Sequence, residues 1–330
     1  LTNDDKYEGV EQFFINLSQA GNATIADDQG IATIRDDGTT NGSLVGSDDD
    51  RPVFSVNSVL VNEAAGTAVF TVTKTGATDL DSTVSYYTSD ISGGAIAGAD
   101  YTAITSGSPG SLTFAANETT KTFTVNISDD TDYEYSEDFQ VNLTGASNAV
   151  VSATEGSGTG TIKDDGTGNS TSGGSGTGSD DDRPVFSIND VTVNEGDGTI
   201  EFTVTLTGDT DIDSSVYYEV LPGNAGLADY AANNPQSLKG TLNFYAGAQH
   251  SKTQTITLDI KQDDIYEIAE TFDIKLSSAQ QALISITDGV GTGTIRDDGT
   301  GGTAVDNDIP SISVKDIRVS EGDGSMTFVV

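Results

Sequence analysis

Short runs in which apolar and polar residues alternate occur along most of the chain. In "AVFTVT" the residues Ala68, Phe70 and Val72 fall on one side, and "KTFTVNI", "EFTVTL" and "QTITLDI" repeat the pattern further along. A period of two over five to seven residues is typical of a half-buried β-strand, and threonine on the outer side suits strands. No segment combines a helical period with helix caps, so the pattern predicts an all-β protein.

The best-defined part of the chain, residues 49–166, contains about seven such runs. Turn residues separate them, as expected for short antiparallel strands. We therefore predict a tandem of immunoglobulin-like antiparallel β-sandwiches with about seven strands each. The predicted strands lie near residues 53–63, 68–75, 83–88, 112–114, 121–127, 139–143 and 150–162, the last with a break.

Three sequence blocks recur in a fixed order, which indicates an internal repeat. The first block includes "DDRPVFSVNSVLVNE", "DDRPVFSINDVTVNE" and "NDIPSISVKDIRVSE"; the second is the acidic block "SDDTDYEYSEDFQVNL" and its relatives; the third is "TIRDDG" or "TIKDDG". The order predicts the end of one repeat, two whole repeats and the start of another, as in a piece of a longer array. The predicted repeat segments are residues 1–38, 49–166, 181–299 and 307–330.

The segments between repeats are rich in Gly, Ser and Thr and have no apolar periodicity. This composition predicts flexible linkers over residues 39–48, 167–180 and 300–306. Acidic triplets stand at residues 48–50 and 180–182. We interpret them as solvated charge, with a weak cation contact that stiffens the linker as the alternative.

The chain is strongly acidic, with 52 Asp and Glu against 14 Lys and Arg and a formal net charge of -38. Such a surface repels phosphate backbones and anionic lipid, so we expect no nucleic-acid partner. There is no Cys, which excludes disulfides and thiolate metal sites. No apolar run is long enough to span a membrane, so we expect no membrane insertion within this segment, and any export signal would lie outside it.

Carboxylates and aromatic residues occur together in "SDDTDYEYSEDF", residues 128–139. Loops gather at the two ends of a sandwich, so this loop, the end of the first strand run and "DDG" after the last strand can share one end. Because clustered carboxylates repel one another and all the donors are oxygens, the pattern favours a calcium ion. The expected cluster contains Glu63, Asp129, Asp130, Glu134, Glu137, Asp164 and Asp165.

These features resemble the Calx-beta domain, a calcium-binding repeat. The matching motifs are "VNE" at 61–63, "GADYTA" at 98–103, "GSLTFAANETTKTFTVNISDD" at 110–130, the acidic loop ending in "EDF", and "GTIKDD" at 160–165. The resemblance implies calcium ligands at Asp90 and the seven residues above in the first whole repeat, and at Glu195, Asp263, Asp264, Glu267, Glu270, Asp297 and Asp298 in the second. In the cut repeats it implies Asp4, Asp5, Glu8, Glu11, Asp36 and Asp37, and Glu321.

Two departures from the family pattern stand out. The position that matches Asp90 is Leu221 in the second repeat, and the closing acidic triplet of the family is shortened to "DDG".

Another motif, "DTDIDS" at 209–214, opens like an EF-hand loop but has Ser214 where Gly is required and Val220 where Glu is required. We interpret it as a hairpin turn.

The repetition argues against an enzyme, since the same acids stand in every module. We expect instead a structural array, exported by a bacterium to the cell surface or beyond, that forms the calcium-stiffened extender of an adhesin or an extracellular matrix filament. The alternative is a metal-independent module that recognises a polysaccharide or a neighbouring copy. In that case the tyrosine pairs at 86–87 and 217–218 would form an exposed platform, whereas strict alternation would put one tyrosine of each pair in the core.

Overall fold

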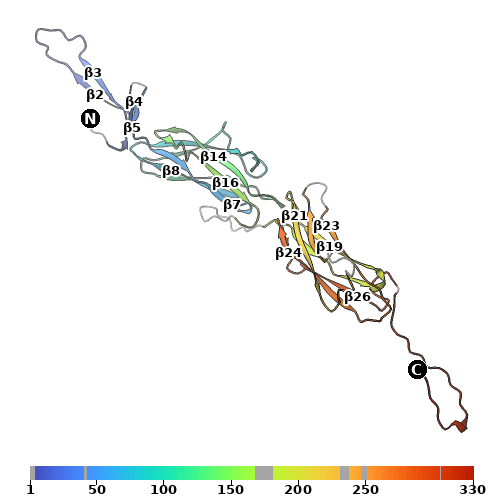
Figure 1. Cartoon of the computed structure of the whole chain (residues 1–330). Helices are drawn as coiled ribbons and strands as arrows, with labels where there is room; N and C mark the ends of the chain where they lie inside the picture. Colours follow the sequence, from blue (N-terminus) through green and yellow to red (C-terminus); the bar gives the residue numbers. More distant parts are fainter. Residues whose placement is uncertain (1–3, 41–42, 168–180, 231–237, 247–250, 305) are drawn as a thin grey trace. The chain divides into compact units, whose positions relative to one another are not determined.

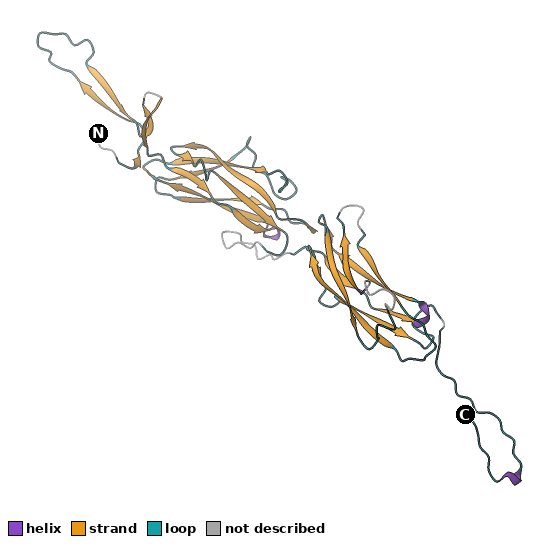
Figure 2. Ribbon diagram, viewed as in Figure 1, coloured by secondary structure: helices purple, strands orange, loops and turns teal. Residues whose placement is uncertain are grey.

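The computed structural model describes residues 4–40, 43–167, 181–230, 238–246, 251–304 and 306–330. The chain divides into two compact units, Leu1–Asp182 and Arg183–Val330. Each unit contains one complete β-sandwich together with shorter flanking segments (Figures 1 and 2).

The first unit packs a five-stranded sheet against a four-stranded sheet. The five-stranded sheet has the order β11-β10-β14-β16-β7, and the four-stranded sheet has the order β12-β8-β6-β15. The strands are β6 (Val53–Val56), β7 (Val59–Asn62), β8 (Thr67–Thr75), β10 (Ser82–Asp90), β11 (Gly110–Phe114), β12 (Thr120–Asn126), β14 (Glu137–Ser147), β15 (Val150–Val151) and β16 (Ser157–Lys163).

The second unit repeats this topology. Its five-stranded sheet has the order β18-β26-β24-β21-β22, and its four-stranded sheet has the order β23-β19-β17-β25. The strands are β17 (Val185–Ile188), β18 (Val191–Asn194), β19 (Thr199–Thr207), β21 (Ser214–Pro222), β22 (Lys239–Phe244), β23 (Thr253–Asp259), β24 (Glu270–Gln280), β25 (Leu283–Ile284) and β26 (Val290–Arg296). The predicted all-β sandwich repeats are therefore confirmed, although the two sheets of each sandwich contain nine described strands where about seven were predicted.

One detail of the strand prediction needs correction. The single run predicted near residues 53–63 is two strands, β6 and β7, which belong to different sheets. Asn57 lies at the crossing, where its side-chain oxygen accepts a hydrogen bond from the Thr71 amide at 2.7 Å. Strand β6 pairs in parallel with β15, and β7 pairs in parallel with β16. The sandwich is antiparallel except at these two edge pairs.

The core of each sandwich lies between its two sheets. In the first unit, the rings of Phe54 and Phe114 are 5.0 Å apart, and the rings of Phe70 and Phe139 are 5.9 Å apart. All four side chains are fully buried, and they come from both sheets. In the second unit Phe186 and Phe244 form the first of these pairs again, at 5.0 Å. The alternating apolar positions of the sequence thus supply the core from both layers.

Short elements connect or extend the sheets. Single 3-10 turns follow β7 and β18 and also occur near the C-terminus. Two-residue strands lie in the turns and in the acidic loops. The additional elements are η1 (Glu63–Ala65), η2 (Glu195–Asp197), η4 (Glu321–Asp323), β1 (Lys6–Tyr7), β2 (Glu11–Asn16), β3 (Gln29–Ile34), β4 (Asp37–Thr40), β5 (Ser43–Asp49), β9 (Ala77–Thr78), β13 (Asp132–Tyr133) and β20 (Asp209–Thr210).

The segments predicted as linkers begin and end at neighbouring points of the structure. Asp37 pairs with Asp49 in the β4–β5 hairpin. Equivalent bridges join Asp165 to Asp181 and Asp298 to Asn307. Most of the predicted linker 167–180 lies outside the described residues. The two ends of each such segment therefore lie beside each other.

Neither terminal segment forms a complete sandwich within its described residues. Strands β2 and β3 form an antiparallel hairpin in residues 11–34, with Phe13 and Phe14 about half exposed. Among the described residues 308–330 no strand is present, and Ile312 is 84% exposed. An isolated pair of strands is only marginally stable without further strands to pack against. The interpretation of residues 307–330 as the start of a repeat stays a prediction.

Candidate metal centre

Glu63 lies at one end of the first sandwich, directly after β7. Asn62 caps the turn η1 by accepting a hydrogen bond from the Ala64 amide, which fixes the position of Glu63. The Glu63 side chain is buried, and its Oε1 accepts a hydrogen bond from the Asp130 amide at 2.8 Å. Burial raises the pKa of Glu63 to about 8, and the carboxylates of Asp164, Asp130 and Asp129 add to the rise.

Asp164 follows β16 and lies close to Glu63. Its Oδ2 accepts a hydrogen bond from the Glu134 amide at 2.9 Å, whereas its Oδ1 is buried and has no hydrogen-bond partner. Burial is the main cause of a rise in the pKa of Asp164 to about 7, and the Asp182 carboxylate is part of that rise. A buried carboxylate oxygen without a partner costs free energy, so this atom marks a point where a cation would be stabilised.

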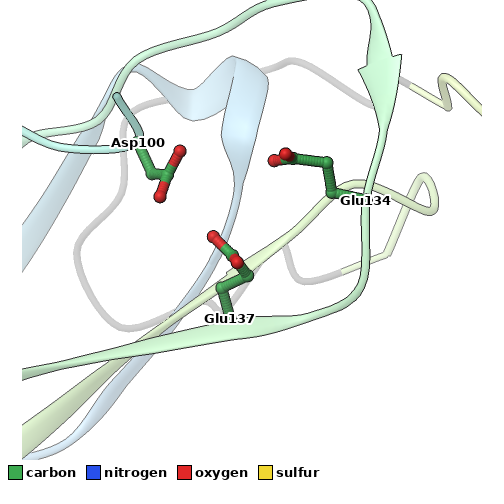
Figure 3. A group of neighbouring side chains, drawn as sticks. All are labelled: Asp100, Glu134 and Glu137. Atoms are coloured by element: carbon green, nitrogen blue, oxygen red, sulfur yellow. The ribbon is translucent and has the colours of Figure 1, made fainter. Parts of the chain in front are cut away.

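A group of three carboxylates completes this end of the sandwich. Asp100, Glu134 and Glu137 each offer an oxygen, and the three oxygens lie within 4.8 Å of one another. Figure 3 shows the three side chains pointing toward a common centre. Burial raises the pKa of Glu137 to about 7, and a hydrogen bond with Asp100 adds to the rise. Like charges this close favour either protonation or a bound cation.

The second sandwich builds the same arrangement from equivalent residues. The Glu195 Oε1 accepts a hydrogen bond from the Asp263 amide at 2.7 Å, and the Asp297 Oδ2 accepts one from the Glu267 amide at 2.8 Å. The Oδ1 of the buried Asp297 again has no hydrogen-bond partner. Asp229, Glu267 and Glu270 form the three-carboxylate group. Burial raises the pKa values of Glu195 and Glu270 to about 7.

The N-terminal segment preserves one hydrogen bond of this arrangement. The Glu8 amide donates to the Asp36 Oδ2 at 3.0 Å, as Glu134 does to Asp164. Asp4 accepts a hydrogen bond from the Lys6 amide, while Asp37 pairs with Arg35. Glu11 is exposed at the start of β2, Asp5 lies beside β1, and Glu321 is exposed in η4. The structure therefore brings Glu8 and Asp36 together without a complete cluster.

Several predicted ligands have other partners in the structure. Asp165 accepts hydrogen bonds from the amide and hydroxyl of Thr167, and Asp298 accepts the same pair from Thr300. The Asp90 Oδ1 accepts hydrogen bonds from the Tyr101 hydroxyl at 2.7 Å and the Ala97 amide at 3.0 Å. Asp90 thus holds the loop that carries Asp100.

The sequence interpretation missed Asp100 and Asp229. Both stand in "ADY", which occurs at residues 99–101 and again at 228–230. The tyrosine of each motif is fully buried and bridges to the strand before the acidic loop, Tyr101 to Ile127 and Tyr230 to Ile260. The motif was noted as part of the family resemblance, and its repetition was the signal that could have identified the two aspartates.

Acids from the far end of the predicted linkers were also missed. The Asp182 carboxylate lies close enough to Asp164 to raise the pKa of that carboxyl. In the second unit, Asp306, Asp297, Asp264 and Asp263 raise the pKa of Asp308 after the effect of burial. Because the described ends of the linker after the first sandwich are paired, Asp165 with Asp181, Asp182 reaches the candidate site. Asp182 therefore lies close to the site, although its triplet was interpreted as solvated charge, and Asp308 lies near the acids of the second site.

Leu221 occupies the position in the second repeat that Asp90 occupies in the first. This difference has a testable consequence. The Tyr230 hydroxyl is buried without a hydrogen-bond partner, whereas the Tyr101 hydroxyl donates to Asp90. Tyr101→Phe should lower the free energy of unfolding by about 1.5–3 kcal/mol, the usual net contribution of a hydrogen bond to a charged group. Tyr230→Phe should leave it unchanged or raise it. Chemical denaturation of both variants measures the difference, and equal losses would contradict this assignment.

The donor set fits calcium. Each complete cluster consists only of carboxylates and main-chain groups on loops, as expected for a hard cation with six to eight oxygen ligands. Burying charged carboxylates without a counter-charge costs free energy. This applies to the unpartnered oxygens of Asp164 and Asp297 and to the three converging carboxylates in each repeat. A divalent cation satisfies both features.

The Calx-beta domain family matches residues 1–38, 47–166 and 179–299. The chain belongs to the Calx-beta domain family. The three matched segments include both complete sandwiches and the N-terminal segment, so the predicted family is confirmed. Residues 307–330 fall outside the matched segments.

Solved Calx-beta structures resemble parts of the chain. CBD12 from CALX1.2 is 19% identical, with a TM-score of 0.35, and the alignment covers 74% of this chain and 99% of that one. The calcium binding domain CBD12 of CALX1.1 is 20% identical, with a TM-score of 0.34 and the same coverage. A tetra-tandem repeat in the extending region of a large adhesion protein is 13% identical, with a TM-score of 0.29, covering 74% of this chain and 48% of that one.

No curated protein matches the chain significantly. The helices in the described part of the chain are all single 3-10 turns, and none is long or apolar enough to cross a membrane.

Proposed function

We propose that the chain is a calcium-binding, non-catalytic repeat array that forms the extender of a large cell-surface or secreted adhesin or matrix protein. One observation carries the calcium assignment: both Calx-beta repeats place a buried Asp with an unpartnered oxygen, Asp164 or Asp297, next to a buried Glu and a group of three carboxylates. A solvated acidic loop would not bury these groups.

Electrostatics explains why a cation would matter to folding. Two unit charges about 4 Å apart repel by about 4 kcal/mol at an effective dielectric near 20, and each cluster contains several. Calcium binds the folded arrangement, which the unfolded chain lacks, so binding stabilises the fold by mass action. The proposed ligands are Glu63, Asp100, Asp129, Asp130, Glu134, Glu137 and Asp164 in the first repeat, and Glu195, Asp229, Asp263, Asp264, Glu267, Glu270 and Asp297 in the second.

The extender role is supported by the repetition and the charge. The same site recurs in each repeat, as expected for a structural device and not for a single catalytic centre. The strongly acidic surface keeps the chain soluble, and calcium is abundant outside cells, where it would be available to sites of extracellular affinity, about 10⁻⁴–10⁻³ M. We therefore place the protein at the cell surface or outside the cell.

The tyrosine pairs do not favour the polysaccharide-binding alternative. Tyr86 stacks on Phe123 with ring centres 3.9 Å apart, and Tyr218 packs against the core of the second unit. Tyr87 and Tyr217 are half-buried. The pairs therefore offer little exposed aromatic surface for stacking on a sugar.

Isothermal titration calorimetry on the whole chain tests the proposal. Calcium should bind at both complete repeats, and magnesium at the same concentration should give a much weaker signal because it retains its hydration water. Small-angle scattering then tests the extender role. A stiffer array should have a narrower distribution of end-to-end lengths in calcium than in a chelator. Binding of magnesium and calcium with equal affinity would contradict the calcium assignment, and unchanged scattering would contradict the stiffening.

A further inference from the structure

The tyrosine of the acidic loop makes a defined contact with the turn of the following repeat. In the first unit, β1 (Lys6–Tyr7) pairs in parallel with β9 (Ala77–Thr78). The Tyr7 carbonyl accepts hydrogen bonds from the Thr78 hydroxyl at 2.8 Å and the Asp79 amide at 3.2 Å. Tyr7 belongs to the partial repeat 1–38, whereas Thr78 belongs to the repeat 49–166.

Packing and charge support the same contact. The Tyr7 side chain is only 8% exposed and Thr78 only 4%, although the segment around Tyr7 has no complete sandwich of its own. The Lys6 Nζ lies 2.5 Å from the Asp79 Oδ2. Backbone pairing and an ion pair therefore converge on one turn, and Tyr7 is buried beside them.

The turn that receives Tyr7 is a repeated feature. Residues 78–82 read "TDLDS" and residues 210–214 read "TDIDS". In both turns the threonine hydroxyl accepts a hydrogen bond from an amide two residues later at 3.0 Å, Leu80 to Thr78 and Ile212 to Thr210. The motif that opens like an EF-hand loop is thus a preformed turn, and its threonine hydroxyl can donate a hydrogen bond to a carbonyl of another repeat.

The second unit presents the tyrosine half of this contact in exposed form. Tyr266 occupies the position of Tyr7 in "DDIYE", which aligns with "DDKYE". Tyr266 is 40% exposed, and the preceding Ile265, in the position of Lys6, is 66% exposed. Ile265 and Tyr266 are therefore exposed together, whereas Tyr7, at the position equivalent to Tyr266, is buried.

We propose that Ile265 and Tyr266 form a docking surface for the "TDxDS" turn of a following Calx-beta repeat. The Tyr7 contact specifies the occupant: a threonine hydroxyl and the next amide donate hydrogen bonds to the tyrosine carbonyl. The proposal rests on the array part of the proposed function, and it does not depend on calcium binding. The acidic loop of one repeat would then form part of the interface with the next repeat.

Tryptophan fluorescence tests this proposal, since the chain contains no Trp. In the natural chain, Tyr7→Trp should be protected from acrylamide and Tyr266→Trp should be quenched several-fold more strongly. A second chain replaces residues 307–330 by another copy of residues 181–299, because Asn307 aligns with Asp181. In that chain, Tyr266→Trp should become as protected as Tyr7→Trp.

A matched variant identifies the contact. Thr210→Val in the appended copy alone removes the hydroxyl donor, and it should restore much of the quenching of Tyr266→Trp. Thr78→Val in the natural chain should likewise expose Tyr7→Trp. If Tyr266→Trp is quenched equally in the natural and extended chains, or if neither threonine variant changes quenching, the proposal is wrong. Repeating the measurements with a calcium chelator separates this failure from a failure of calcium binding.

Discussion

Replacing Asp164 and Asp297 by asparagine will abolish most of the stabilisation by calcium while leaving the calcium-free protein as stable as the natural chain or more stable. Asparagine retains an oxygen that can accept the hydrogen bond from the Glu134 or Glu267 amide. It removes a buried negative charge that has an unpartnered oxygen. Without calcium the substitution relieves repulsion, whereas with calcium it removes a charged ligand from each site.

The expected effect is large because calcium stabilises by mass action. Calcium at 100 times its dissociation constant contributes about 2.7 kcal/mol per site, and the double variant should lose most of this in both repeats. Thermal unfolding with calcium and with a chelator measures it. Asp165→Asn with Asp298→Asn is the matched control, since these neighbours bond to Thr167 and Thr300. Equal losses in both double variants would refute the specific role of Asp164 and Asp297.

Without calcium, the protein should lose stability as the pH rises from about 5 to about 8. The pKa of Glu63 is about 8 and those of Asp164, Glu137, Glu195 and Glu270 are about 7 in the folded protein, against about 4 for unfolded carboxyls. The folded state therefore binds more protons in this window. Stability must fall as these protons leave.

The melting temperature in a chelator should fall by about 5–10 °C over this range, given that about 1 kcal/mol corresponds to 2–4 °C for a domain of this size. Saturating calcium should remove or reverse the slope, because calcium binds the deprotonated carboxylates and competes with protons. Melting curves at several pH values check both arms. A calcium-free protein that becomes more stable between pH 5 and pH 8 would contradict the burial of these carboxylates.

Much of the fold could be predicted from alternation alone. Phe70 and Phe139 stand in runs of period two, and both are fully buried in opposite sheets. The split between β6 and β7 could not be predicted, because both strands lie in one apolar run and the change of sheet depends on the distant contact between Asn57 and Thr71. Local periodicity reports which side of a strand is buried but not which sheet the strand joins.

The candidate site was predicted in part. The acids on the loop after β12 and at the ends of β7 and β16 come together because sandwich topology gathers those loops. Asp100 and Asp182 were missed for another reason: their positions depend on long-range pairs, Tyr101 with Ile127 and Asp165 with Asp181. Asp90, implied by the resemblance alone, supports the loop of Asp100 through Tyr101.

The central claim is that the buried carboxylates form calcium sites that stabilise each repeat. The most direct test is thermal unfolding of the whole chain at neutral pH in calcium, in magnesium and in a chelator. The melting temperature should increase strongly with calcium and change little with magnesium. Identical melting in all three conditions would contradict this claim and would leave the clusters as acidic loop ends without a bound ion.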